Sequence, residues 1–209
     1  MPHAVIVAYA RSPFTLANKG ELAKVRPDDL LAVVLKGLLA KQPINGVDIE
    51  DVLVGCAFPE GEQGLNIARN VSFLAGLPLT AGGVTVNRFC GSSMEAVHMA
   101  AGKIAIGAGE LFICAGVESM SRIPMGGFNP SPNADLYEAM PGAYMSMGIT
   151  AENVCAKHNI DRKSQEEFAL ASHQKAAKAN LAEEIIPVPV RGGVVDKDGC
   201  IRGDSTLEK

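Results

Sequence analysis

The stretch "VTVNRFCGSSMEAVHMAAGKIAIGAGELFICAGV", residues 84–117, decides the fold that the rest of the chain must join. It begins with an apolar β-type run, breaks at Gly-Ser-Ser, continues as an Ala-rich helical pattern and ends in a second Val- and Ile-rich run. Two short buried strands joined by a helix are typical of a parallel βαβ unit. Cys90 lies in the turn between the first strand and the helix, where it is either a small core residue or a nucleophile.

The sequence before this stretch continues the same alternation. One helical pattern starts at Pro27, and a second one ends at Gly76. They separate short apolar runs that are bounded by turn residues. The sequence therefore predicts an α/β fold, one βαβαβαβ half with a mixed, mainly parallel sheet. Its buried strands are predicted at residues 4–10, 51–57, 84–89 and 111–117.

The composition changes after Val117. Residues 119–146 are rich in Pro, Gly, Ser, Asn and Met without a period, which predicts a long loop. Two polar helices are predicted near 148–158 and 162–180, the second with a capping box from Ser164 to Glu167. We expect an α/β domain at 1–118 and part of a second, helical domain at 119–209. The chain ends without a closing core element, which we interpret as the end of a fragment.

Composition and charge exclude several classes of protein. A hydrophobic content of 47% and a charged content of 20% are typical of a globular chain. The formal net charge of −4 provides no basic field for nucleic acid or anionic lipid. The N-terminus lacks the pattern of a secretory signal or a membrane span. Five scattered cysteines without a C-x-x-C pair indicate neither disulfides nor a metal site, so we expect reduced thiols in the cytoplasm.

The turn around Cys90 favours an anion. A helix predicted to begin at Ser92, with a capping box to Glu95, is expected to be buried nearly all round and to end at Gly107 or Gly109. A helix N-terminus stabilises a negative charge by about 0.3–1 kcal/mol, and by up to about 2 when partly buried. A tenfold change in ionisation corresponds to about 1.4 kcal/mol. The turn therefore prepares a thiolate, but a base partner is needed to complete it.

None of the four histidines is a convincing base. His98 lies eight residues after Cys90, roughly 12 Å along a helix axis, and cannot reach the thiol. His158 and His173 belong to polar helices, and His3 begins a predicted strand. We expect the base to lie outside this chain. Residue-level reasoning alone leaves both interpretations of Cys90 open, because free cysteines are often simply buried. The other four cysteines are predicted to be core or unremarkable thiols.

Three separated motifs carry a family resemblance that covers essentially the whole chain. They are "NRFCGSSMEAV", "CAGVESMSRIPM" and "SMGITAENVCAKHNIDRKSQEEFALASHQKAA". "EGEQGLNIARNVSFLAGLP" and "VIVAYARSPF" support them. The chain resembles the N-terminal half of a thiolase, most similar to degradative 3-ketoacyl-CoA thiolases.

The resemblance implies a thiolase-like layered fold and an acyltransferase function in fatty-acid β-oxidation. Cys90 would attack a 3-ketoacyl-CoA, release acetyl-CoA and hold the shortened acyl chain as a thioester, with coenzyme A as co-substrate. The loop from Ser119 would begin the CoA-binding loop domain, in which Met147 lines the pantetheine channel. The family's second-half histidine, asparagine and second cysteine motifs are missing here, so the chain alone is expected to be inactive.

The resemblance also implies a homodimer that pairs the strand at about 84–88 across a two-fold axis, with a possible β-oxidation partner subunit. Other enzyme classes fit less well. A ketoacyl synthase also has a cysteine at a helix N-terminus, but "ESMS" and "MGITAENV" favour a thiolase. A cysteine hydrolase would need glycines where Arg88 and Ser92 stand. A nucleotide-binding domain would need a phosphate loop, which is missing. A non-catalytic module that binds acyl-CoA or a partner remains an alternative.

Overall fold

The computed structural model describes residues 3–208, and the chain forms two compact units. The first unit comprises residues 1–128 and 181–200, and the second comprises 129–180 and 201–209. The first unit contains the sheet and Cys90. The expected functional division at residues 118/119 stays a prediction. Each unit is described by itself.

The first unit is built on a parallel three-stranded sheet with the order β2-β1-β3. Its strands are β1 (Asp51–Gly55), β2 (Gly82–Val86) and β3 (Phe112–Gly116). The central strand places Leu53 beside Val84 on one side and Cys114 on the other. The α/β fold with a parallel sheet is therefore confirmed, and each end of the three strands lies within three residues of its predicted position.

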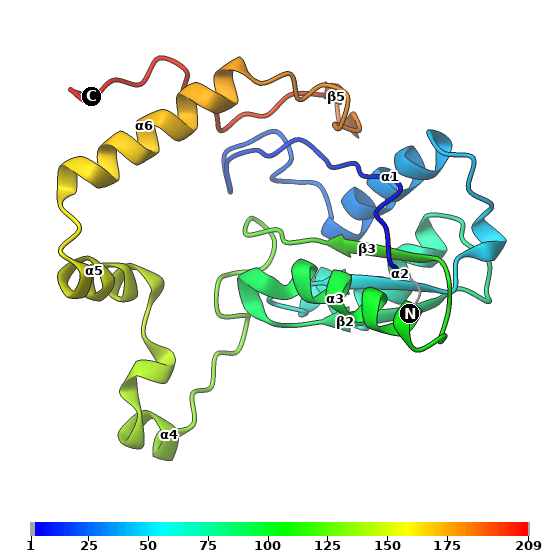
Figure 1. Ribbon diagram of the computed structural model, residues 1–209, viewed down its shortest axis with the longest axis horizontal. Helices are drawn as coiled ribbons and strands as arrows, with labels where there is room; N and C mark the ends of the chain where they lie inside the picture. Colours follow the sequence, from blue (N-terminus) through cyan, green and yellow to red (C-terminus); the bar gives the residue numbers. More distant parts are fainter. Residues whose placement is uncertain (1–2, 209) are drawn as a thin grey trace. The chain divides into compact units, whose positions relative to one another are not determined.

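Helices cover both faces of this sheet (Figure 1). They are α1 (Pro27–Ala40) and α2 (Ile67–Leu74) on one face and α3 (Ser92–Ala105) on the other. Alternate side chains of a strand point to opposite faces, so Val52 and Val54 join the cluster with α1 and α2. Leu53 joins the cluster with Ala96 and Ala100 of α3. The result is a three-layer arrangement around β1, whose Val52, Leu53 and Val54 are fully buried.

The predicted strand at residues 4–10 is wrong. This segment forms no strand, and Val5, Ile6, Val7 and Tyr9 are 64–79% exposed. A β-type run becomes a strand only where a neighbour supplies its hydrogen bonds, and no described strand pairs with it. Only Arg11, just beyond it, makes an isolated parallel bridge, to Ile185.

The predicted helix boundaries at Pro27, Gly76 and Gly107 agree with the structure, whereas the predicted N-terminal capping boxes do not. Pro27 is the first residue of α1. Gly76 and Gly107, with positive φ values of 80° and 72°, directly follow the C-cap residues of α2 and α3. Both predicted capping boxes are wrong. Ser92 is the first residue of α3, and its hydroxyl bonds the preceding turn. Helix α6 is capped by Asp161, whose carboxylate accepts the N–H of Ser164.

Helix α3 is not buried all round. Its buried residues are Ser92, Ala96 and Ala100, which face the sheet, whereas Met94 is 64% and Val97 39% exposed. The small residues do allow close packing, but only on the face that has a packing partner. The expectation that the whole helix is buried is therefore wrong.

The remaining elements are short or lie in the second unit. The first unit also contains η1 (Gly46–Asp48), η2 (Gly61–Gln63), η3 (Phe89–Gly91) and the hairpin of β4 (Val188–Val190) and β5 (Gly193–Val195). The second unit contains α4 (Ala134–Ala139), η4 (Pro141–Tyr144), α5 (Met147–His158) and α6 (Arg162–Lys178). Both predicted polar helices are present, but the predicted loop at 119–146 includes two short helices.

Candidate functional site

Cys90 lies at the carboxyl end of β2, in the single 3-10 turn η3 that leads directly into α3. Its thiol is exposed. Ligands of open parallel sheets bind at this end of the strands, and the N-terminus of α3 directs its free N–H groups there. Cys90 is thus an exposed thiol directly before the N-terminus of α3.

Glycines at the ends of two strands let α3 approach the sheet closely. A side chain on Gly55, the last residue of β1, would stand 2.3 Å from the backbone nitrogen of Ser93. A side chain on Gly116, the last residue of β3, would stand 2.8 Å from the Cβ of Ser93. These two glycines therefore fix where α3 begins, and with it the position of the Cys90 turn.

A buried amide joins the ends of β1 and β3. Gln63 is fully buried, and its Nε2 donates to the backbone oxygen of Phe58 at 2.8 Å and to the Glu118 carboxylate at 2.6 Å. Its Oε1 accepts the N–H of Ser119 at 2.7 Å. The second oxygen of Glu118 accepts the N–H of Ala57 at 2.7 Å. The carboxyl edge of the sheet is thereby a connected polar network rather than a set of loose loop ends.

Sequence reasoning missed this network. Gln63 and Glu118 are 55 residues apart and belong to different loops. Gln63 lies in "EGEQG", which has no apolar period, and Glu118 lies in the quoted "CAGVESMSRIPM". The one available signal was that two polar residues follow adjacent parallel strands.

The four histidines offer no base to Cys90 within the first unit. His98 lies on α3 with its Nδ1 3.8 Å from Glu95, and its side chain is 66% exposed. His3 is exposed in the unpaired N-terminal segment. His158 and His173 belong to α5 and α6 of the second unit, where His173 accepts the N–H of Arg202 at 3.2 Å.

The remaining cysteines differ from Cys90 in their surroundings. Cys56 is buried, and burial raises the pKa of its thiol to about 11, with the nearby Glu118 charge adding to the effect. Burial likewise raises the pKa of the Cys114 thiol. Cys155 is half-buried on α5, and Cys200 is exposed. All five are free thiols.

Met147 begins α5 in the second unit. Ser146 precedes it as the N-cap and accepts the N–H of Ile149 at 3.4 Å. The Met147 side chain is 70% exposed, so it is open to contact with a ligand. Cys90 and Met147 therefore lie in different units.

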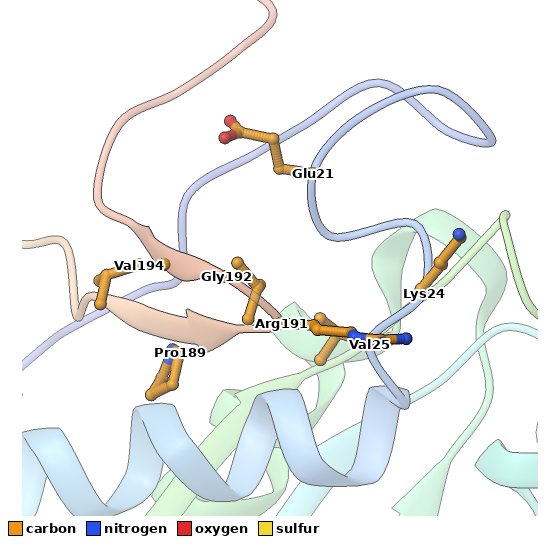
Figure 2. A pocket seen from close by; sticks show the side chains of 9 residues that line it. Glu21, Lys24, Val25, Pro189, Arg191, Gly192 and Val194 are labelled. Atoms are coloured by element: carbon orange, nitrogen blue, oxygen red, sulfur yellow. The ribbon is translucent and has the colours of Figure 1, made fainter.

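Figure 2 shows a separate surface hollow of about 690 Å³ between the loop before α1 and the β4–β5 hairpin. Lys24 and Arg191 are its cationic lining residues, and Glu21 is the acidic one. None of its lining residues belongs to the Cys90 turn. The hollow is therefore not part of the candidate site.

Residues 3–208 contain neither a metal-binding cluster nor a membrane-spanning helix. Within that range no three His, Cys, Asp or Glu side chains gather in a way that would hold a metal ion. Over the same residues, every helix is too short or too polar to cross a bilayer.

Comparison with known proteins gives a consistent result. Residues 4–209 match the family described as "Thiolase, N-terminal domain". The chain is 48% identical over 202 residues to the 3-ketoacyl-CoA thiolase of Bacillus subtilis. The aligned residues make up 95% of this chain and 52% of that protein. It is also 42% identical over 221 aligned residues to the 3-ketoacyl-CoA thiolase of Colwellia psychrerythraea. That alignment covers 100% of this chain and 56% of the Colwellia protein. The chain spans about half the length of the curated relatives it matches.

Proposed function

Because the chain belongs to the thiolase family, matching its N-terminal domain, we propose that it is the N-terminal part of an acyl-CoA thiolase with Cys90 as nucleophile. The relatives named above are 3-ketoacyl-CoA thiolases, which suggests 3-ketoacyl-CoA as substrate and coenzyme A as co-substrate. The observation that carries the proposal is an exposed thiol at the N-terminus of α3 within the "NRFCGSSMEAV" motif.

The proposed reaction has two steps. In the first, the Cys90 thiolate attacks the keto carbon of a 3-ketoacyl-CoA and forms a carbon–sulfur bond. The bond between that carbon and the neighbouring methylene breaks, and its electron pair takes a proton to give acetyl-CoA. In the second step, the thiol of free coenzyme A attacks the Cys90 thioester, which releases the shortened acyl-CoA and regenerates the thiol. The reverse sequence is a Claisen condensation.

The chain's own contribution is to present and stabilise the nucleophile. The N–H groups at the start of α3 and the dipole of the helix favour negative charge at Cys90. Helix-terminus effects are worth about 0.3–2 kcal/mol, and a cysteine nucleophile is commonly activated by an adjacent general base as well. We propose that the activating histidine belongs to the half of an intact thiolase that this chain does not include, so that the chain alone is acylated and turns over far more slowly than an intact thiolase.

Coenzyme A is proposed to contact the second unit through Met147. The support is the exposure of this side chain at the start of α5 and its place in the "SMGITAENV" motif. Met147→Ala is expected to weaken coenzyme A binding in equilibrium dialysis. Met140→Ala, at a methionine that is 61% exposed in the same unit, is the matched control and is expected to change nothing. Equal effects of the two variants would contradict the assignment.

We also propose that the protein forms a homodimer through β2. This strand is at the edge of the sheet, and Leu65, Leu79 and Phe73 nearby in the sequence are 47–92% exposed. An unpaired edge flanked by apolar side chains is a template for pairing with a second chain. Sedimentation over a range of concentrations tests this, and a strictly monomeric chain would contradict it.

A role in β-oxidation, with a possible partner subunit, and a cytoplasmic location complete the proposal. A reducing compartment suits an exposed nucleophilic thiol, because such a thiol is otherwise readily oxidised.

The decisive experiment follows acyl transfer to the protein. The chain is incubated with excess acetoacetyl-CoA, digested and analysed by mass spectrometry for an acetyl group on each cysteine. We expect acetylation of Cys90, its loss in Cys90→Ser and no change in Cys200→Ser, a control at another exposed thiol.

Equal acetylation of Cys90 and Cys200 would indicate simple chemical exchange and contradict the proposed role of Cys90. If coenzyme A binds but no cysteine is acetylated, the chain is instead a non-catalytic acyl-CoA-binding module. Cleavage of acetoacetyl-CoA at a rate comparable to that of an intact thiolase would contradict the proposal that the activating group lies elsewhere.

A further inference from the structure

The backbone just before Cys90 has an unfavourable conformation. Phe89 has a φ of 45°, in the left-handed region that bulky L-residues rarely adopt. Such a conformation is unfavourable and persists only where the surroundings hold it. Because Cys90 is the next residue, whatever holds Phe89 also sets the direction of the thiol.

Two side chains bind both polar groups of the Phe89 backbone. The Oδ1 of Asn87 accepts the N–H of Phe89 at 2.9 Å. The hydroxyl of Ser92 donates to the carbonyl oxygen of Phe89 at 2.5 Å and accepts the N–H of Arg88 at 2.8 Å. The turn is therefore clasped from the strand side by Asn87 and from the helix side by Ser92.

Both side chains are themselves anchored. Ser92 is 4% exposed, and its Cβ lies against Gly55 at the end of β1. The Nδ2 of Asn87 donates to the backbone oxygen of Ala57 at 2.9 Å. Through these anchors, Asn87 and Ser92 fix the turn relative to the end of β1. A side chain without such an anchor would not hold a strained peptide.

Other contacts in the turn are weaker. The rings of Phe89 and Phe58 lie 6.0 Å apart at 56°. Arg88 and Glu95 form an ion pair at 2.9 Å, but the Arg88 side chain is 70% exposed, and pairs so exposed contribute little. The hydrogen bonds of Asn87 and Ser92 are therefore the main restraint on the turn.

We propose that Asn87 and Ser92 are positioning residues that hold the left-handed Phe89 peptide and thereby keep the Cys90 thiol at the N-terminus of α3. The inference rests on the proposed function, in which Cys90 is the nucleophile. Neither side chain needs to touch the substrate. When either bond is removed, Phe89 relaxes, and the thiol leaves the position where the helix N-terminus stabilises its anion.

The test is the rate of iodoacetamide labelling of each cysteine in the full chain at one pH, followed by mass spectrometry. Ser92→Ala and Asn87→Ala are expected to lower the ratio of Cys90 to Cys200 labelling about three- to tenfold, the range that loss of a helix-terminus interaction allows. Ser93→Ala is the matched control, because Ser93 is an exposed neighbour in the same helical turn. It is expected to leave the ratio within about twofold of the wild-type value.

Buried Cys56 separates positioning from loss of structure. Partial unfolding would expose the Cys56 thiol and increase its labelling, whereas loss of positioning lowers labelling of Cys90 and leaves the labelling of Cys56 unchanged. Asn87 is exposed, so its variant provides the test even if the Ser92 variant fails to fold.

The outcomes are distinguishable. A wild-type Cys90 that reacts faster than Cys200, with no decrease in either variant, overturns the positioning role and leaves Cys90 as the nucleophile. A wild-type Cys90 that reacts no faster than Cys200 overturns the proposed function and this inference with it.

Discussion

The buried amide of Gln63 provides a quantitative test of the polar network at the carboxyl edge of the sheet. Gln63→Leu keeps the size of the side chain and removes its polar atoms. The change removes bonds to the Phe58 carbonyl, the Ser119 N–H and the Glu118 carboxylate. Two neutral bonds at about 1 kcal/mol each and one charge-assisted bond at about 1.5–3 kcal/mol give a total of about 3.5–5.

That total is an upper bound, because Glu118 is exposed and water replaces part of its lost bond. We therefore expect the free energy of unfolding to fall by about 3 kcal/mol. Urea titration followed by circular dichroism measures it, with the slope of the transition compared between variants.

The matched control is Gln42→Leu. Gln42 is half-buried in the same unit, and its side chain makes no hydrogen bond within residues 3–208. Its replacement is expected to change the free energy of unfolding by less than about 0.5 kcal/mol. A loss below about 1 kcal/mol in Gln63→Leu, or an equal loss in both variants, would refute the conclusion that the network stabilises this edge.

Three further predictions address the core, the acid stability and the thiols. Leu53→Ala, at a fully buried position of the central strand, should cost about 3–5 kcal/mol in a urea titration, whereas Leu65→Ala at a 92% exposed position should cost little. The hydrogen bonds from Arg11 lower the pKa of Asp198, so this pair stabilises the protein above the usual carboxyl pKa of about 4 and ceases to do so as the pH falls through the lowered pKa. Asp198→Asn should therefore flatten the acid limb of a plot of melting temperature against pH, and an unchanged limb would contradict this. Because the pKa of the Cys56 thiol is raised to about 11, Cys56 should label last of the five cysteines at pH 8, and early labelling would show that it is not buried in solution.

Much of the sheet and helix layout could be predicted from local pattern. The strands around Leu53, Val84 and Ile113 are short apolar runs bounded by turn residues, and such runs commonly form the strands of a parallel sheet. The run at residues 4–10 has the same composition but is not a strand, because pairing depends on a neighbour rather than on composition.

One part of the candidate site could likewise be predicted from local sequence, and another part could not. Cys90 could be singled out because a strand-to-helix turn is a local feature of the sequence. The hydrogen bond from the Ser92 hydroxyl to the Phe89 carbonyl was not predicted. The spacing of Ser92 and Glu95 suggested a capping box, and spacing alone cannot show that the hydroxyl turns back toward Phe89. Glu95 instead pairs with Arg88.

The α/β class, the position of Cys90 at a helix N-terminus and the family to which the chain belongs could all be recognised from the amino-acid sequence. These features depend on residues that are neighbours along the chain, or on short contiguous sequence motifs. Only the tertiary structure decided that Gln63 ties Phe58 to Glu118 and that Gly55 sets the start of α3. Those contacts join segments tens of residues apart, and their partners are fixed by the order in which parallel strands lie side by side.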